Sequence, residues 1–322
     1  MALYDYYFMN RKTTAQILIP LIAILCFLPF LGSASALLLG VAIAVFLGNP
    51  YSSQKYIHTL LAFAVAGLGA GMNLETVTKV GLQGIEATFI SISSIFLLGF
   101  ILLKLLRVDK DTGLLITAGT AICGGSAIAA LSPILGSKHH STSVALGTVF
   151  VLNAIALIVF PPIGHILGIP EKAFGLWSAL AIHDTSSVVG ATLTYGPTAA
   201  VIGTTVKLAR ALWIVPITIL VSFISNRSNI EKNTPVKKPW FIAWFIFVAA
   251  LVTWVPSLRP AGYIIELISK KMMVLTLFLI GLSLSRETIK SVGIRPFILG
   301  ITLWLITGAV SLLSILYGLI KI

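Results

Sequence analysis

The sequence predicts an all-α, polytopic membrane protein, and three observations carry this prediction. First, 57% of the 322 residues are hydrophobic, only 10% are charged, and the mean hydropathy is +1.03. Second, the apolar residues form runs long enough to cross a bilayer, separated by short polar segments. Third, these runs lack the alternation at period 2 that a membrane β-barrel requires. The composition therefore excludes a soluble globular protein.

The apolar runs predict about eleven transmembrane helices within a single integral membrane domain, residues 1–322. Spans one to eight occupy 15–225, a polar cytoplasmic linker occupies 226–238, and spans nine to eleven occupy 239–319. The individual spans are expected at about 15–31, 34–48, 56–72, 84–106, 111–135, 141–167, 173–195, 197–225, 239–256, 262–285 and 296–319. An odd number of spans places the two termini on opposite sides of the membrane.

Basic residues test this arrangement and explain the formal net charge of +12. With eleven spans, the side that holds the N-terminus carries 14 Lys and Arg, and the other side carries 6. Cytoplasmic loops are enriched in Lys and Arg, so this bias predicts a cytoplasmic N-terminus and a C-terminus outside. Topology and lipid headgroups account for the charge, and we expect the lipid bilayer, not nucleic acid, as the partner.

An internal repeat is the first indication of function. The segment Gly69–Val77 resembles Gly281–Ile289, and Glu75-Thr76 aligns with Glu287-Thr288 at an offset of 212 residues. The two segments run in opposite directions in the eleven-span arrangement, as an inverted-topology repeat requires, and such repeats are typical of secondary transporters. The alternative is that a helix end rich in small residues recurs by chance.

Two spans are interrupted near their middle. The fifth contains Cys123-Gly124-Gly125-Ser126, where paired glycines weaken the helix. The seventh contains His183-Asp184-Thr185-Ser186-Ser187. Backbone that is opened inside a membrane must find partners or face a cavity, so both breaks predict a place where something small is held. If every span crosses the membrane once, the fifth and seventh spans run in the same direction. Either one of the two segments is therefore re-entrant, or the two breaks resemble each other by convergence.

Three charged residues lie well inside spans, whereas Glu86 and Glu266 lie nearer the ends of theirs. Asp184 is the one acidic residue clearly inside, and a charge there costs about 2.5–3.5 kcal/mol unless it is paired. Asp184 could have a functional role or cap the helix that follows it, and the two roles are compatible. Lys207 and Arg210 stand three residues apart on one helix face and should point inward. Snorkelling to a helix end is the alternative for this pair.

The charges predict the sign of the ligand. Lys207 and Arg210 outweigh Asp184, and two half-helix N-termini add further positive potential, so an anion is favoured. The expected substrate-binding residues are Cys123, Gly124, Gly125, Ser126, Thr185, Ser186, Ser187, Lys207 and Arg210, and the expected coupling residues are His183 and Asp184. For Asn153, a lone polar residue in the sixth span, hydrogen bonding between helices is at least as good an explanation as a role in ligand binding. No metal-ligand spacing, cofactor motif or catalytic residue is expected.

The motifs Ala121–Ile128, Ile182-His183-Asp184 and Val206–Arg210 resemble the YeiH-type membrane family, whose members carry the label sulfate exporter. The resemblance covers about residues 20–319. It implies a bacterial inner-membrane protein with distant similarity to the bile-acid symporter and cation/proton antiporter fold. In that fold two discontinuous helices cross at the bilayer midplane, and a core domain moves against a panel domain.

We therefore predict a secondary transporter of a small inorganic or organic anion, sulfate or sulfonate-like, that works by alternating access. Proton coupling and a homodimer are left open. The alternatives are a cation/proton antiporter that uses Asp184, a channel, and, remotely, an intramembrane enzyme that uses His183 and Asp184. An enzyme lacks a plausible nucleophile, because Cys123 has no base adjacent in the sequence.

Overall fold

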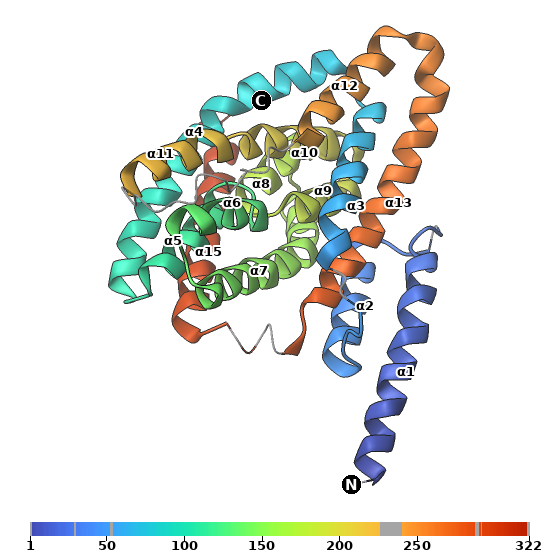
Figure 1. Cartoon of the computed structure of the whole chain (residues 1–322). Coiled ribbons are helices and arrows are strands. Elements are labelled where there is room, and N and C mark those ends of the chain that lie inside the picture. Colours follow the sequence, from blue (N-terminus) through green and yellow to red (C-terminus); the bar gives the residue numbers. More distant parts are fainter. Residues whose placement is uncertain are drawn as a thin grey trace. The chain divides into compact units, whose positions relative to one another are not determined.

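The computed structural model describes residues 2–28, 30–51, 54–225, 240–286, 290 and 292–320, which form helices, turns and bends without a strand (Figure 1). The linker expected at 226–238 lies outside the described residues. The helices belong to two compact units, each made of two chain segments: Met1–Leu74 with Phe241–Ile289, and Glu75–Trp240 with Lys290–Ile322. The prediction of a single transporter domain stays a prediction, and the two units are described separately.

The first unit packs its helices around α13. Its elements are α1 (Ala2–Leu25), α2 (Ser33–Phe46), α3 (Gln54–Leu68), η1 (Gly69–Gly71), α12 (Trp240–Trp254), η2 (Pro256–Leu258) and α13 (Arg259–Ser283). Helices α2 and α13 approach so closely that a Cβ on Gly281 would lie 2.3 Å from the carbonyl oxygen of Leu37. A Cβ on Gly69 would likewise lie 2.3 Å from the carbonyl oxygen of Phe245.

The two glycines that begin the predicted repeat, Gly69 and Gly281, thus occupy positions where only a residue without a side chain fits. Close backbone contact is one reason for the small residues at both helix ends. The repeat itself stays a prediction, because Glu287, Thr288 and Ile289 lie outside the described residues.

The second unit contains α4 (Leu74–Leu105), α5 (Lys110–Ala121), α6 (Gly125–Leu135), α7 (His139–Ile166), α8 (Glu171–Ala181), α9 (Thr185–Tyr195), α10 (Pro197–Ala211), α11 (Ile214–Ser225) and α15 (Ile294–Leu316). A cluster of aromatic side chains forms part of its interior. The indole of Trp177 stacks on Phe160 with ring centroids 4.2 Å apart, and its Nε1 donates to the carbonyl oxygen of Gly308 at 2.9 Å. These contacts join α7, α8 and α15.

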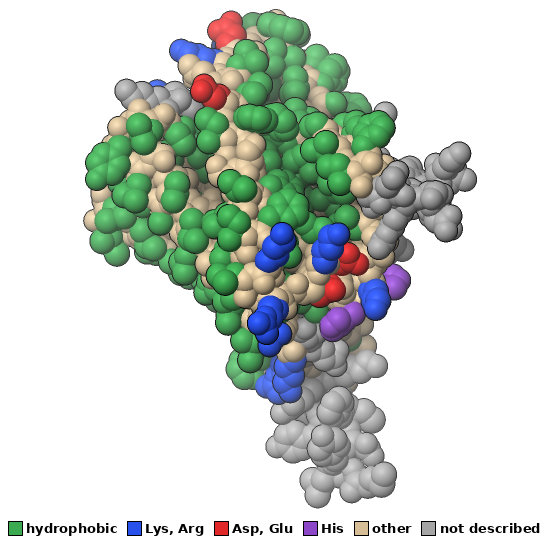
Figure 2. Space-filling model, turned by 90° about the vertical axis from the view of Figure 1, so that its left-hand side faces the viewer, with side chains coloured by type: hydrophobic (Ala, Val, Ile, Leu, Met, Phe, Trp, Pro, Cys, Tyr) green, Lys and Arg blue, Asp and Glu red, His purple; other side chains and the backbone are tan. Residues whose placement is uncertain are grey.

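Four helices of the second unit are long and apolar enough to cross a membrane: α4, α7, α15 and the continuous stretch Pro197–Ile224 formed by α10 and α11. Among the described residues, α12 with η2 and α13 forms one further candidate, which bends by 109°. Figure 2 shows a wide zone of hydrophobic side chains on the displayed face, with charged side chains gathered toward its edges. The structure thus supports a helical membrane protein, but it does not confirm eleven spans.

Residues 110–135 fold back on themselves instead of crossing as one span. A continuous helix of this length would be about 39 Å long. Instead, Asp109, which precedes α5, accepts a hydrogen bond from the hydroxyl of Ser141, in the first turn of α7, at 3.3 Å. A Cβ on Gly119 in α5 would also lie 2.9 Å from Ile128 in α6. Helices α5 and α6 therefore form an antiparallel pair, called hairpin 1 below.

Residues 171–195 form a second such pair, hairpin 2, from α8 and α9. Glu171, at the start of α8, accepts a hydrogen bond from the backbone N–H of Thr198, which follows α9, at 2.7 Å. Tyr195, at the end of α9, donates its hydroxyl to the carbonyl oxygen of Ile169 and stacks on Phe174 with centroids 3.6 Å apart. The two ends of this segment therefore also lie together.

Helix α7 shows that the hairpins open in opposite directions. This helix has 28 residues, about 42 Å. Hairpin 1 opens beside its first turn, at Ser141. Hairpin 2 opens beside its last turn, where a Cβ on Gly164 would lie 2.6 Å from both Phe174 and Tyr195. Two segments that simple threading makes parallel are thus inverted relative to each other, because neither passes from one end of α7 to the other.

Candidate functional site

The tips of the two hairpins meet inside the second unit. Gly124, between α5 and α6, has φ +67° and ψ −125°, and a Cβ there would lie 3.4 Å from Cα and Cβ of Asp184. Asp184 stands between α8 and α9, where both Ile182 and Asp184 have an extended conformation. The breaks expected from the sequence are therefore present and in contact, and four helix ends converge on this point, here called the crossing.

Arg210 joins the two hairpins. Its side chain is completely buried. In α5, Nε donates to the carbonyl oxygen of Ala121 at 2.7 Å and Nη2 to that of Thr120 at 3.3 Å. In α8, Nη1 donates to the carbonyl oxygens of Leu180 at 2.6 Å and Ala179 at 3.2 Å. Since the last carbonyls of a helix have no partner within it, one guanidinium satisfies the C-terminal ends of both first arms.

Lys207 acts one turn earlier on α10 in the same way. Its ammonium group, also fully buried, donates to the carbonyl oxygen of Ile182 at 2.6 Å and to that of Ala179 at 3.4 Å. The inward placement predicted for Lys207 and Arg210 agrees with the structure. Their observed hydrogen bonds go to carbonyl oxygens at helix C-termini, where a cation is favoured, so direct binding of a substrate by this pair stays a prediction that the geometry does not favour.

Asp184 caps helix α9. Its Oδ2 accepts hydrogen bonds from the backbone N–H of Ser187 at 3.2 Å, from the hydroxyl of Ser187 at 3.5 Å and from the hydroxyl of Ser186. The capping interpretation of Asp184 is thereby confirmed. No ion pair joins it to Lys207 or Arg210 among the described residues. Asp184 is half-buried, whereas Thr185, Ser186 and Ser187 are buried.

The N-terminus of α6 differs from that of α9. Its N-cap, Gly124, has no side chain, and the backbone N–H of Ala127 donates to the Cys123 thiol instead. Gly125 is buried and Ser126 is exposed. Cys123 is 2% exposed and fills the turn. Of the residues expected to bind substrate or couple its transport, Ser126 and Asp184 are thus the ones with appreciable exposure. The other expected residues build the crossing from within.

Asn153 on α7, for which the sequence left a hydrogen bond between helices and a ligand role open, lies beside the hairpin 2 break. Its Oδ1 accepts hydrogen bonds from the backbone N–H groups of His183 at 3.1 Å and Asp184 at 3.2 Å, which holds the hairpin 2 break open. Its Nδ2 is buried and has no hydrogen-bond partner among the described residues. The signal was present as a lone Asn in an apolar span, but nothing local showed that it lies beside the break.

His183 is 1% exposed, and neither imidazole nitrogen has a hydrogen-bond partner among the described residues. Buried polar groups are normally paired with protein or ordered water, so a polar ligand or water beside His183 and Asn153 would complete the site. The described residues contain no group of three or more His, Cys, Asp or Glu side chains that could hold a metal ion. At the exposed start of α5, the backbone N–H of Thr112 donates to the Asp109 carboxylate and lowers the pKa of that carboxylate.

The fold and the crossing define a class: a helical membrane protein with two inverted hairpins that meet at their tips. Within it, the chain belongs to the family described as conserved hypothetical protein 698, whose profile matches residues 14–300. The resemblance to the YeiH-type family, also designated UPF0324, is thereby confirmed. The distant fold similarity that it implied is not shown, and no solved structure gives a significant match.

Curated relatives cover nearly the whole chain. A UPF0324 membrane protein of Bdellovibrio bacteriovorus is 55% identical over 314 residues, which are 96% of this chain and 97% of that relative. One from Geobacter sulfurreducens is 44% identical over 307 residues, 95% and 96% of the two chains. One from Bacteroides thetaiotaomicron is 46% identical over 286 residues, 88% and 85%. Their shared name describes membrane proteins.

Proposed function

We propose that this protein is a secondary transporter of a small anion, sulfate or sulfonate-like, in the inner membrane of a bacterium. The observation that carries the proposal is the contact between two inverted hairpins at Gly124 and Asp184. Broken helices that meet within the membrane present helix ends to a ligand, and inverted elements let the same site open to either side. A transporter uses such a site without a catalytic residue, so no enzymatic activity is proposed.

The charges at the crossing support an anion. Each helix N-terminus carries about half a positive charge and each C-terminus about half a negative one. The four helix ends therefore cancel, and Lys207 and Arg210 outweigh Asp184 by one charge when all three are ionised. The N-terminus of α6, with Ser126 exposed on it, is the accessible group of matching sign. Protonation of Asp184 or His183 during transport would add proton coupling.

The hairpins also revise the expected topology. In the eleven-span arrangement Lys138 lies outside and Lys172 lies inside. If the two hairpins do not cross the membrane, Lys138 lies inside and Lys172 lies outside. The basic bias stays at 14 to 6, because one Lys replaces the other. We propose that the N-terminus and the open end of hairpin 1 are cytoplasmic, and that the open end of hairpin 2 and the C-terminus lie outside.

Cysteine labelling in intact cells tests this topology. After Cys26 and Cys123 are replaced by alanine, Lys138→Cys is expected to react with a membrane-impermeant maleimide only once the cells are permeabilised. Lys172→Cys is expected to react in intact cells. Both native side chains are exposed, so the reagent can reach either position from its own side of the membrane. Labelling of Lys138→Cys from outside and of Lys172→Cys only from inside would restore the eleven-span arrangement and exclude the hairpins.

Uptake into proteoliposomes tests the substrate site. Ser126→Leu is expected to lower the uptake of radiolabelled sulfate or methanesulfonate at least about tenfold, since an apolar side chain would cover the open N-terminus of α6. Ser126→Ala should lose much less, because the backbone donors remain. Ser94→Leu, at an exposed position of α4, is the matched control. Equal uptake by Ser126→Leu and Ser94→Leu would reject the proposed site.

A cation/proton antiporter is the second candidate, and the partial exposure of Asp184 favours it. Currents on solid-supported membranes separate the two functions. A sulfate gradient without sodium should drive current if the anion proposal is right. A current that requires a sodium gradient and disappears in Asp184→Asn, with no response to sulfate, would favour the antiporter. Substrate-dependent saturation would separate either transporter from a channel.

A further inference from the structure

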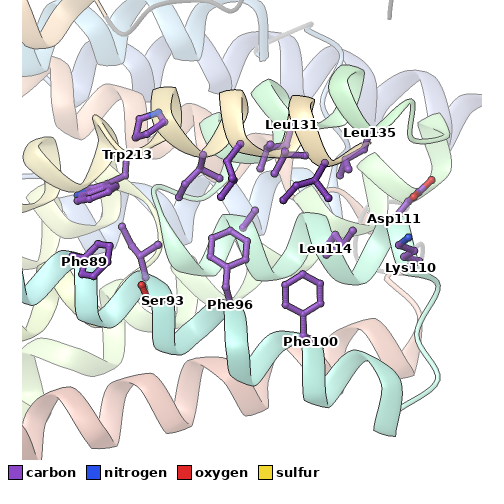
Figure 3. Close-up of a pocket in the computed structure, with 17 residues that line it drawn as sticks. Phe89, Ser93, Phe96, Phe100, Lys110, Asp111, Leu114, Leu131, Leu135 and Trp213 are labelled. Carbon is purple, nitrogen blue, oxygen red and sulfur yellow. The ribbon is translucent and has the colours of Figure 1, made fainter. Parts of the chain in front are cut away.

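A cavity lies in the second unit beside hairpin 1. It is bounded by α4, α5, α6 and α11 and has a volume of about 630 Å³, within the range of about 300–1,000 Å³ common for ligand pockets (Figure 3). Ser126 and Asp184 do not line it. The cavity therefore requires an explanation separate from the transport site.

Figure 3 shows an elongated groove with different ends. Phe89 and Trp213, whose ring centroids are 5.5 Å apart, lie at one end, and Lys110 and Asp111 lie at the other. Of the seventeen described residues that line the groove, Lys110 and Asp111 are charged and Ser93 carries a hydroxyl. The other fourteen are apolar or aromatic. The groove thus offers a long apolar channel that leads to a pair of opposite charges.

The groove borders the apolar surface of two spans. Several of its lining side chains are strongly exposed, among them Phe100 on α4 at 47%, Leu220 on α11 at 57% and Ile224 on α11 at 73%. On helices that cross a membrane, such faces contact lipid. Hydrocarbon chains fill any apolar groove that opens to the bilayer, so the remaining question is which lipid stays. An acyl chain gains little free energy by exchanging other acyl chains for an apolar groove, so contacts with the headgroup must determine which lipid stays bound.

We propose that the groove binds one acyl chain of a zwitterionic phospholipid, phosphatidylethanolamine, whose phosphate meets Lys110 and whose ammonium group meets Asp111. Neither side chain forms an ion pair within the described part of the chain, and Lys110 is exposed while Asp111 is partly so. A lone lysine would suit an anionic lipid; a Lys–Asp pair is complementary to both charges of a zwitterion. The lipid would rest against both arms of hairpin 1, through Leu114 and Leu131.

Native mass spectrometry of the full-length protein tests the proposal, with phosphatidylethanolamine, phosphatidylglycerol and oleate added separately. One molecule of phosphatidylethanolamine per protein is expected, retained at least about fivefold better than either competitor. The combined variant Lys110→Gln with Asp111→Asn should erase this preference, whereas Lys172→Gln, an exposed lysine away from the groove, should keep it. Equal retention of the three lipids, or an unchanged preference in the combined variant, would overturn the proposal.

Fluorescence quenching gives a test that does not need the headgroup variants. Trp213 lies at the end of the groove opposite Lys110. Its emission is obtained as the difference between the native protein and Trp213→Phe. In detergent, phosphatidylethanolamine brominated near the chain terminus should quench this emission saturably, and the same lipid brominated near the carboxyl group should quench it much less. Equal quenching by both lipids, or quenching that does not saturate, would contradict the proposed orientation.

Discussion

Replacing Arg210 with alanine is expected to cost about 3–5 kcal/mol of folding free energy, a loss typical of breaking a buried charged network. The guanidinium is completely buried and donates to four carbonyl oxygens, two in each hairpin. Without it these acceptors stay buried and unpaired, and each unpaired group costs about 1–3 kcal/mol. The yield of monodisperse protein and its melting temperature in detergent would measure the loss.

Two variants make this prediction specific. Arg295→Ala removes an exposed arginine from α15 of the same unit and should leave the melting temperature nearly unchanged. Arg210→Lys keeps the charge but loses the planar donors that reach both hairpins, so an intermediate melting temperature is expected. If Arg210→Ala were as stable as Arg295→Ala, Arg210 could not be the link between α5 and α8.

The positions of the breaks could be predicted because their causes are local. Paired glycines weaken a helix, and Asp184 followed by Ser186 and Ser187 provides capping groups, so the sequence alone marks both interruptions. The burial of Lys207 and Arg210 could also be predicted, since a charge this far from a helix end is too costly to face lipid. Each of these inferences depends on residue type and spacing alone.

The direction of the chain after each break could not be predicted. An apolar run of 25 residues has the same hydropathy whether its halves continue or fold back. Contacts between residues far apart in the sequence decide, such as Asp109 with Ser141 and Glu171 with Thr198. The partners of the buried cations were missed for a related reason. Counting charged side chains omits the carbonyl oxygens at helix ends, and these are the groups that Lys207 and Arg210 bind.

The carbonyl partners change what Lys207 and Arg210 would contribute to the proposed transport. A cation bound to carbonyl oxygens of both first arms fixes the two tips against each other, and its charge still raises the potential at the crossing. The groups exposed there are Ser126 and Asp184, which lie in the second arm of hairpin 1 and at the tip of hairpin 2. The division is therefore between buried residues that assemble the crossing and accessible residues that can meet a ligand.

Gly124 is the residue whose replacement should most directly separate the tips. Its φ of +67° combined with ψ of −125° is a conformation that residues with a side chain rarely adopt. A Cβ would also lie 3.3 Å from Val149 and 3.4 Å from Asp184. Gly124→Ala is therefore expected to cost about 1–3 kcal/mol from strain alone. Because the strained backbone must relax at the tip and the methyl group presses on Val149 beside Asp184, sulfate uptake should fall well beyond the loss of folded protein.

Gly168→Ala is the matched control for Gly124→Ala. Gly168 also has a positive φ, +61°, but nothing lies within 4 Å of a Cβ placed there, and it follows α7 at the open end of hairpin 2. Its replacement should cost about 1 kcal/mol and leave uptake per folded molecule unchanged. Equal uptake per folded molecule in the two variants would show that contact between the tips is not needed for transport. A selective loss in Gly124→Ala would tie transport to this tip, because both substitutions place a side chain at a positive φ but only the methyl group at Gly124 meets other residues.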